Sequence, residues 1–438
     1  MTRRPTTITA AVLLGLATLA APPLSAQGRR AWGRVSFLAN TSTTTPDTGE
    51  SSSFGEFATT VTFHSAEDDT DSFEYGLDTR LAGYAAEGRD PRVSVYDAWV
   101  GRRMMDGRLL VRGGHMWVNE VGGLGSIAGG LVEWRRKVTA GTLRVAGFAG
   151  LEPRVFTGGY VPDVWRAGGH VTLEGRAGRR HTAGYVTIRN SGLTERSVLT
   201  TTNYLPVAGK VFVYQAAEVD LSGPAGQGSG GLTYFFVNGR AAVAPRVDLQ
   251  GTFHRGRSID TRTITVDQAN GRPVSVQALD GLLYESVTSR VTVEATKGVR
   301  VFGGLGRDRT DRDADATLRY NAGFHASGQA LAGADLTVSY SRMDRGQPGS
   351  YGSWYVSAGR SVSARVYLSG DFSSSLAITR FTRSDGVVIE TRPETKRFSV
   401  TALANLTRSL SLLVTAEHTR DTGARENRLL AGLTWRLP

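Results

Sequence analysis

The sequence of 438 residues contains no cysteine and very little lysine. The absence of cysteine excludes a disulfide scaffold, a thiolate metal site, a cysteine nucleophile and a lipid-anchoring N-terminal cysteine. Beyond its first residues the chain also lacks any apolar stretch near the ~20 residues that a spanning helix needs, which excludes a bundle of membrane helices. Among its 51 cationic residues, the only lysines are Lys137, Lys210, Lys297 and Lys396.

The formal net charge is 51 − 40 = +11, almost all of it from arginine. An arginine surplus is one signature of nucleic-acid binding when the arginines cluster. Here they are scattered through the sequence with carboxylates between them, and no basic block or tail stands out. The sequence therefore predicts no nucleic-acid partner.

Residues 1–26 have the pattern of a secretory signal peptide. Arg3 and Arg4 precede an apolar stretch at 8–21, and Leu24-Ser25-Ala26 forms a small-residue cleavage site before Gln27. A permanent anchor is the competing interpretation, but the apolar stretch is too short for it and ends in two prolines. We expect export, a mature chain of 27–438 and a mature charge of +9 once the two arginines are removed.

After Gln27 the dominant signal is an alternation of apolar and polar residues with period two, which is typical of strands with one apolar face. In segment 317–329, for example, Leu318 and Tyr320 alternate with Arg319 and Asn321. Counting such segments gives nominally 22 strands, and 18 to 22 if the weak ones near 129–136, 181–190 and 197–204 merge. Most are 9 to 12 residues long, which suits a tilted membrane crossing of about 9–11 residues.

Short and long connections alternate along the chain, as in outer-membrane barrels with short periplasmic turns and long extracellular loops. The tight connections are 104–107, 177–180, 241–245, 296–298, 331–333 and 407–409. The longer ones are 41–55, 119–128, 151–164, 257–283 and 374–395. An even strand number then places both termini on the periplasmic side.

Two of the long loops contain turn signals of their own. Asn270-Gly271 and Asp385-Gly386 tolerate the positive φ of two-residue hairpin turns. We expect loops 257–283 and 374–395 to form hairpins that extend the strands or fold over the mouth and obstruct it.

In lipid every backbone N–H and C=O must be paired within the protein, so strands can cross only as a closed sheet. The predicted fold is all-β, a single closed antiparallel transmembrane barrel over 27–438, with no second domain. Only a few residues separate Gln27 from the first strand at Trp32, too few for a plug. A soluble propeller or solenoid is the alternative, but no fixed repeat is present, and the polar strand faces carry too much charge for a buried layer.

The final strand, Gly432-Leu433-Thr434-Trp435-Arg436-Leu437, carries the one local motif of this fold. With the whole-chain pattern, it resembles outer-membrane β-barrels of the porin-like kind. The stretch from 95–99 through Gly113-Gly114 and 122–130 loosely resembles early strands of porin-type channels. The resemblance implies an outer-membrane lipid environment and recognition of Gly432, Trp435 and Leu437 by barrel-insertion machinery. Pro438 departs from the aromatic residue on which such chains often end.

No motif predicts a catalytic site, a metal site or a cofactor. Gly123-Leu124-Gly125-Ser126-Ile127-Ala128 fits a dinucleotide fingerprint, but the strand and helix that it needs are missing, so a surface loop is the better interpretation. Asp311, Asp313 and Asp315 lack the glycine and the final glutamate of a calcium loop. The histidines show no ligand spacing. We expect a protein that is not an enzyme.

Charged residues on the predicted inward faces are the candidate site. An arginine facing lipid at mid-depth costs about 2–4 kcal/mol, so these side chains are expected to line the lumen. They pair across strands, bind carboxylate or phosphate solutes, or do both. The candidate pore-lining residues are Asp78, Arg80, Arg112, Arg144, Glu174, Arg246, Asp248, Arg290, Glu294, Arg319 and Arg365.

The sequence predicts a passive channel for small hydrophilic solutes, and the net positive charge predicts a mild preference for anions. Two alternatives remain open at this point. One is a conduit that exports a polysaccharide or other polymer within an envelope-spanning system. The other is a barrel with a filled interior that serves as a structural or surface-binding element.

Overall fold

The computed structural model describes residues 31–65, 71–85, 89–154, 159–207, 209–223, 231–346, 349–385 and 387–437. The predicted signal peptide at residues 1–26 lies outside the described residues, so its cleavage stays a prediction. Within the described ranges, no helix has both the length and the apolar character needed to cross a membrane.

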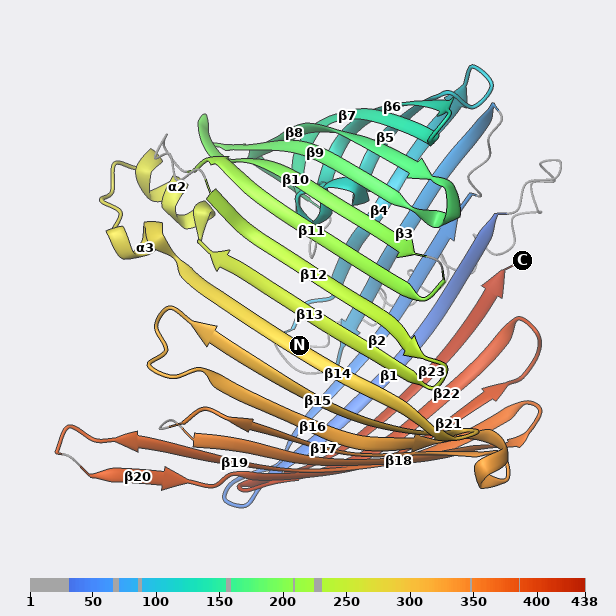
Figure 1. The fold of residues 1–438 in the computed structure, drawn as a ribbon, viewed down its shortest axis with the longest axis vertical. Helices are drawn as coiled ribbons and strands as arrows, with labels where there is room; N and C mark the ends of the chain where they lie inside the picture. Colours follow the sequence, from blue (N-terminus) through green and yellow to red (C-terminus); the bar gives the residue numbers. More distant parts are fainter. Residues whose placement is uncertain are drawn as a thin grey trace, which may run out of the picture.

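The strands form one antiparallel sheet that closes on itself, because β1 (Trp32–Pro46) pairs along its length with β23 (Ala424–Leu437) (Figure 1). Of 23 strands, 22 form the wall. The exception is β20 (Val388–Thr391), which pairs only with the end of β19 (Val366–Thr382), while β21 (Glu394–Asn405) pairs with the rest of β19. The prediction of a closed antiparallel barrel with an even number of strands, nominally 22, is confirmed.

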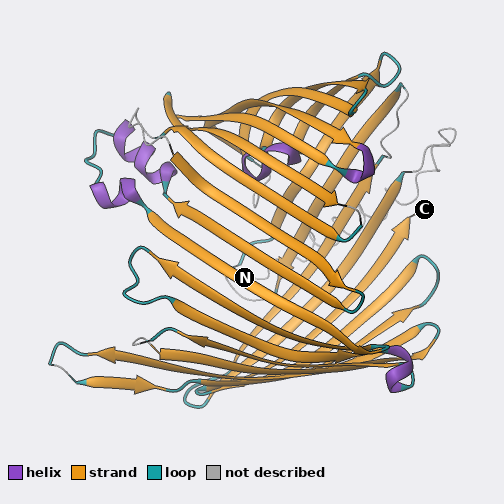
Figure 2. Ribbon diagram, in the orientation of Figure 1, coloured by secondary structure: helices purple, strands orange, loops and turns teal. Residues whose placement is uncertain are grey.

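The other strands follow one another around the wall in chain order, and all three segments with weak alternation are real strands (Figure 2). They are β2 (Ser52–His64), β3 (Ser72–Tyr84), β4 (Arg92–Met104), β5 (Leu109–Trp117), β6 (Ser126–Val138), β7 (Gly141–Pro153), β8 (Tyr160–Gly175), β9 (Arg180–Asn190), β10 (Leu193–Val207), β11 (Val211–Ser222), β12 (Gly231–Ala244), β13 (Val247–Ser258), β14 (Leu282–Thr296), β15 (Val299–Thr310), β16 (Thr317–Ala326), β17 (Ala334–Asp344), β18 (Gly349–Ser363) and β22 (Leu410–Asp421).

The first and last described strand ends, Trp32 and Leu437, lie at the same end of the barrel, which we call the terminal rim. All the tight connections expected from the sequence lie at this rim; one contains the 3-10 helix η2 (Arg176–Gly178) and another η4 (Gly328–Leu331). All the longer connections lie at the other end, the opposite rim. The first of them is shorter than expected, because β1 and β2 continue until only 47–51 remains between them.

The loop between β13 and β14 folds as two helices, α2 (Thr261–Ala269) and α3 (Val276–Asp280), so the hairpin predicted at Asn270-Gly271 is wrong. Asp260 caps α2 by accepting a hydrogen bond from the Thr263 N–H. Gly271 has the positive φ that Asn-Gly tolerates, 68°, but it uses this geometry just after the C-terminus of α2. The same dipeptide suits a helix end and a hairpin turn equally well.

The hairpin predicted for loop 374–395 is present. Strands β19 and β20 pair from Thr379↔Thr391 to Thr382↔Val388 and extend the sheet past the opposite rim, at the lower left of Figure 1. Gly386 of the predicted turn lies outside the described residues. Because this hairpin projects beyond the wall, it does not supply the obstruction that we expected of it.

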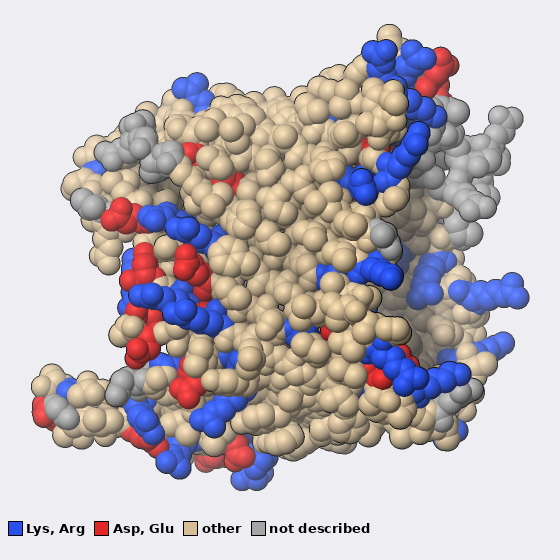
Figure 3. All heavy atoms as spheres, viewed as in Figure 1, with Lys and Arg blue, Asp and Glu red and all other residues tan. Residues whose placement is uncertain are grey.

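The outer surface has an apolar belt between two charged rims. Large apolar side chains at mid-strand are exposed on it, among them Phe37, Phe57, Val132, Leu199 and Val291. Figure 3 shows a wide uncharged band over the visible wall, with Lys, Arg, Asp and Glu gathered at its two edges. Such a belt matches the hydrocarbon layer of a membrane, so the chain is a closed transmembrane β-barrel of porin-like architecture.

Candidate functional site in the lumen

The connection between β5 and β6 folds into the barrel instead of lying at its surface. It contains the 3-10 helix η1 (Asn119–Leu124), which packs against β8, β9 and β10. The hydrogen bond from the Val118 N–H to the Gly125 C=O, 2.9 Å, closes the base of this loop. The expectation of a surface loop at 119–128 is therefore wrong. This inward loop narrows the lumen from one side.

Apolar contacts hold the inward loop against the wall. Val121 and Leu124 are buried against side chains on the inner faces of the strands, including Phe148, Val186 and Val198. Burial of a side chain of this kind contributes about 1.5–3 kcal/mol. Gly184 on β9 makes the close approach possible, because a Cβ there would lie 2.7 Å from Cγ1 of Val121.

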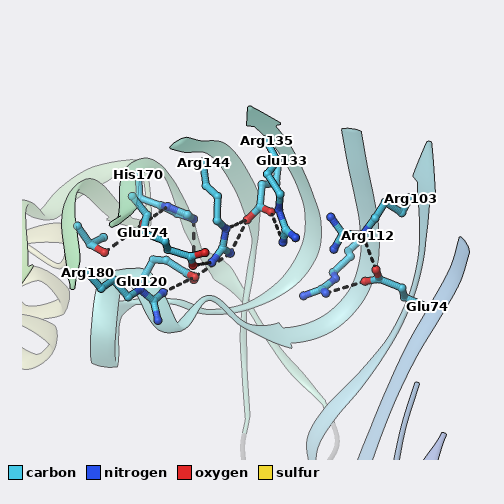
Figure 4. A network of polar contacts seen from close by, with 12 residues as sticks. Glu74, Arg103, Arg112, Glu120, Glu133, Arg135, Arg144, His170, Glu174 and Arg180 are labelled. Carbon is cyan, nitrogen blue, oxygen red and sulfur yellow. Dashed lines mark hydrogen bonds and ion pairs between the residues drawn. The ribbon is translucent and has the colours of Figure 1, made fainter. Parts of the chain in front are cut away.

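Ion pairs fix the same loop from its polar side (Figure 4). Glu120 of η1 accepts hydrogen bonds from Arg144 on β7, 3.0 Å, and from Arg180 on β9, 2.8 Å. Arg144 also donates to Glu133 at 2.5 Å and to Glu174 at 2.9 Å. Arg144 thus joins the inward loop to three wall strands, and its positive charge is matched by three carboxylates.

A second cluster lies on β3, β4 and β5. Glu74 accepts hydrogen bonds from Arg103 and Arg112, both at 2.8 Å. Glu74 and Arg103 are fully buried, and the Arg112 guanidinium carbon lies 4.1 Å from the centre of the Trp99 ring. The two hydrogen bonds to Glu74 offset part of the cost of burying these charges, and they join β3 to β4 and β5.

Further pairs continue the charged arc toward the opposite rim. Arg196 donates to Glu218 at 2.9 Å and to Asp220 at 2.9 Å. Arg262 of α2 reaches the wall and donates to Glu195 at 2.9 Å and to Glu152 at 2.7 Å. The loop that contains α2 is thereby held toward the inner faces of β7 and β10, so the prediction that loop 257–283 folds over the mouth holds for this helix.

The rest of the inner wall has a different character. From β17 to β1 small hydroxyl side chains are the most frequent type at the inward positions, and charged side chains such as Asp371, Arg397 and Glu417 lie between them. The partly exposed hydroxyl residues include Ser339, Ser357, Ser373, Thr401, Thr415 and Thr434. The two sides of the lumen therefore differ. One side is occupied by the inward loop and lined by charged residues, and the other is an arc whose hydroxyl side chains are open to water.

Nine of the candidate pore-lining residues lie on inward strand faces. They are Asp78, Arg80, Arg112, Arg144, Glu174, Asp248, Arg290, Glu294 and Arg319. Arg246 and Arg365 do not, because their strands start one residue later, and both lie in turns at the terminal rim. Both residues therefore lie at an end of the barrel, and their role in lining the pore stays a prediction.

Most of these residues pair with a neighbour and not with one another. Arg80 pairs with Glu56 at 2.7 Å and Arg240 pairs with Asp248 at 3.1 Å. Arg319 pairs with Asp308, and the Arg290 guanidinium carbon lies 3.9 Å from the centre of the Phe302 ring. Only Arg144 and Glu174 form a pair within the predicted set.

The sequence pattern missed several partners for identifiable reasons. Glu120 and Arg262 belong to connections, where no periodicity reports direction. Arg103 lies beyond an irregular step in the pairing of β3 with β4, where Asp78↔Asp97 is followed by Thr79↔Val95. Such a bulge reverses the inward and outward positions that follow it. Glu74 was on the inward face in the alternation itself, so a search for opposite charges on neighbouring strands could have found it.

Two groups in the α2 loop have shifted pKa values. The hydrogen bonds that Asp260 accepts from the backbone and side chain of Thr263 lower the pKa of its carboxyl. The hydrogen bond to Glu152, followed by that to Glu195, raises the pKa of Arg262 despite partial burial. Both shifts favour the charged form that holds the helix in place.

No group of His, Asp and Glu side chains suited to a metal ion occurs in the part of the chain that the structure describes. Two of the three alternating aspartates instead bind backbone N–H groups: Asp313 accepts from Thr310 at the end of β15, and Asp311 accepts from Leu283 at the start of β14. Of the terminal motif, Trp435 and Leu437 lie on the lipid face and Gly432 lies on the inward face.

No protein-family profile and no curated protein matches this chain. Among solved structures, the ferric enterobactin receptor PfeA from Pseudomonas aeruginosa is similar over 94% of this chain and 81% of its own, with a TM-score of 0.53 and 10% identity. OpdQ from the same organism covers 93% and 98%, with a TM-score of 0.44 and 10% identity. Acinetobacter baumannii OccAB4 covers 93% and 98%, with a TM-score of 0.41 and 9% identity. At this identity, the similarity to the receptor concerns the fold.

Proposed function

We propose that this barrel lies in an outer membrane, with its terminal rim toward the periplasm, and that it passes small hydrophilic solutes passively. The observation that carries the proposal is the hydroxyl-lined arc from β17 to β1, whose inward side chains remain open to water. A wall with an apolar outer belt and a wetted inner face suits an aqueous path across a membrane. The porin-like architecture supports the same function.

The inward loop with η1 sets the size limit in this proposal. It is fixed by buried Val121 and by the two arginines that bind Glu120, so the narrowing is a built part of the barrel. Solutes pass between this loop and the hydroxyl arc. The expectation of no enzymatic activity is retained as part of the proposal.

The mild anion preference stays a prediction, with a changed physical basis. The arginines of the charged arc are largely matched by carboxylates, which leaves little free positive charge there. Eight cations instead occupy turns of the terminal rim, and none of them forms an ion pair with a described carboxylate: Arg108, Arg176, Arg179, Lys210, Arg246, Lys297, Arg365 and Arg408. Figure 3 shows blue side chains dominating the right-hand rim. Free cations at a channel mouth raise the local concentration of anions.

A liposome-swelling assay with sugars of graded size tests the channel directly. Liposomes containing the folded barrel are expected to swell in small sugars, with a rate that falls to zero above a size limit. Swelling no faster than that of empty liposomes for every sugar would contradict the proposal, and is the result expected of a closed export conduit or a filled barrel.

Insertion through β23 is part of the same proposal. Trp435 and Leu437 present an apolar edge to lipid at the terminal rim, which supports their role, with Gly432, as the signal for barrel-insertion machinery. Replacing Trp435 with Ser is expected to reduce the amount of folded barrel in the membrane without changing the conductance of the barrels that do insert. An unchanged amount of folded barrel in the membrane would mean that Trp435 is not part of the insertion signal.

A further inference from the structure

A band of aromatic rings runs along the inner wall from β10 to β14. We call it the aromatic track; it consists of Tyr204, Phe212, Tyr214, Phe236, Tyr234, His254 and Tyr284. Ring centres in contact are separated by 4.7 Å for Tyr204 and Phe212, 5.9 Å for Tyr214 and Phe236, 6.2 Å for Phe236 and His254, 5.3 Å for Tyr234 and His254, and 5.5 Å for His254 and Tyr284.

The strand register shows that the track climbs the wall. Phe212 lies at the start of β11, next to the terminal rim, and Tyr284 lies at the start of β14, next to the opposite rim. Between them, Tyr214↔Asn238, Ala216↔Phe236 and Glu218↔Tyr234 are successive inward pairs of β11 and β12. The rings therefore form a path along the direction of transport, not a belt around the barrel.

These rings keep part of their surface exposed on the inner wall. All members except Tyr204 are half-buried, and Tyr204 is 43% exposed. The inward neighbours of Phe236 and Tyr234 across the strands are the small residues Ala216 and Gly256, and the His254 ring lies next to Gly256. The inward loop packs against β8–β10, and α2 packs against β9 and β10. Most of the aromatic track lies on β11 to β14, to one side of these contacts. Partly exposed aromatic side chains on an inner wall offer apolar surface to a solute that has an apolar face.

Hydrogen-bonding groups follow the rings row by row. Beside Phe212 on the same inward row lie Arg240 and Gln250. Beside Tyr214 lie Asn238 and Thr252, which hydrogen-bond to each other at 2.7 Å. A solute stacked on the rings would therefore find donors and acceptors at its edges, as a molecule with a hydroxyl-covered rim requires.

The charges near the track argue against a cation as the solute. Aromatic faces bind cations by attraction to the ring, and free carboxylates beside them would strengthen such a site. Here Glu218 is engaged by Arg196, and Asp308 is engaged by Arg319 and by the Tyr284 hydroxyl at 3.1 Å. The surroundings of the track are close to neutral.

We propose that the aromatic track binds carbohydrate, and in particular linear oligosaccharides that slide from ring to ring; this inference rests on the proposed channel function and names its substrate class. A sugar ring has an apolar C–H face for stacking and hydroxyls at its edge for the flanking groups. Because the track continues for several rings, a linear oligosaccharide contacts more of it than a single sugar does. Affinity therefore increases with oligosaccharide length.

The experiment measures block of the ion current through single channels in a planar bilayer by a linear glucose hexasaccharide, with free glucose for comparison. The hexasaccharide is expected to interrupt the current at concentrations where glucose does not. Phe236→Leu and Tyr214→Leu, which remove a ring and keep an apolar side chain, are each expected to weaken the block about three- to tenfold. Phe235→Leu is the matched control, since Phe235 lies on the lipid face against Phe253 with ring centres 5.9 Å apart.

The possible outcomes separate this inference from the channel itself. A channel that conducts but is not blocked by the hexasaccharide, or whose block is unchanged in both track variants, overturns the inference and leaves the channel intact. Block by 4-nitrophenol without block by the hexasaccharide overturns the carbohydrate class. A folded barrel with no current at all overturns the channel proposal, and this inference with it.

Discussion

Arg144 on β7 donates a hydrogen bond of 3.0 Å to Glu120, which lies in the loop between β5 and β6. Both side chains are mostly buried, with 16% and 11% of their surfaces exposed. This contact connects the inward loop to the wall, so the size limit of the proposed channel depends on it.

Glu120→Gln is expected to loosen the inward loop without removing it, because the apolar contacts of Val121 remain. Losing charge-assisted hydrogen bonds of this kind costs about 1.5–3 kcal/mol. Hydrogen exchange of the Val121 amide should therefore become faster, and the size limit in liposome swelling should increase. Glu50→Gln, at an exposed position of the opposite rim, is the control. An unchanged exchange rate would mean that Glu120 does not hold the loop.

Gly184→Val is expected to displace the loop altogether, since the new Cβ would lie 2.7 Å from Val121 and 2.8 Å from the Thr200 hydroxyl. Higher single-channel conductance and protease cleavage within 118–125 are the measurements. Gly239→Val is the matched control, because a Cβ there meets nothing closer than 3.9 Å. If both variants behave like the original chain, the loop does not pack on β9 as described.

Arg262→Gln is expected to release α2 from the wall. It removes the donors to Glu152 and Glu195 and leaves two carboxylates close to each other. We expect more frequent transitions in single-channel current and faster exchange of the Thr265 amide. Arg272→Gln, in the same loop with an exposed pair to Asp267, should leave both unchanged. Equal current noise in the two variants would argue against a role for α2 at the mouth.

The N-terminus of α2 has a defined pH dependence. The pKa of Asp260 is lowered by hydrogen bonds from Thr263, so its stabilising effect is complete above the ordinary pKa of the carboxyl and is lost as pH falls through the lowered value. Protection of the Thr263 amide should therefore persist at pH 5 (about one unit above the ordinary value) and fall only in stronger acid. Asp260→Asn should abolish this acid transition, and its persistence in that variant would assign it to another group.

The cations of the terminal rim are expected to set ion selectivity. Replacing four of them with Gln together should reduce the anion preference, and the reversal potential in a salt gradient should move toward zero. The four are Arg108, Arg246, Arg365 and Arg408. Replacing Arg312 and Arg345 at the opposite rim should change it less, because Asp311 and Asp313 lie in the connection of Arg312, and Arg345 interacts electrostatically with Asp313. Cation selectivity in the original chain would end the anion prediction.

Alternation along the chain predicted the wall well, because every strand has to present one face to lipid and one to water. It placed Arg80, Arg144 and Arg319 inward without any structural information. It failed where the period breaks, at the bulge at Tyr96 in β4 and at the irregular step between Thr194 and Arg196 in β10. A single extra residue there reverses every later position, so Arg103 could not be assigned from its neighbours.

The sequence predicted the rim at which each connection lies, but not its exact length or its shape. Asn270-Gly271 fits a hairpin and a helix end alike, and the choice was made by capping at Asp260 and by the attachment of Arg262 to the wall. The inward course of the loop around Val121 depends on a pocket made by strands that lie far ahead in the sequence. From the sequence alone, Gly184 cannot be distinguished from other glycines in strands, because its role depends on the loop that packs against it.

The claim on which the whole account depends is that a closed wall surrounds a water-filled path. Single-channel recording of the purified, folded barrel in a planar bilayer tests it most directly. The account predicts discrete current steps whose conductance rises in proportion to salt concentration and persists at low voltage. Membranes that contain the inserted barrel and conduct no better than bare lipid would contradict it.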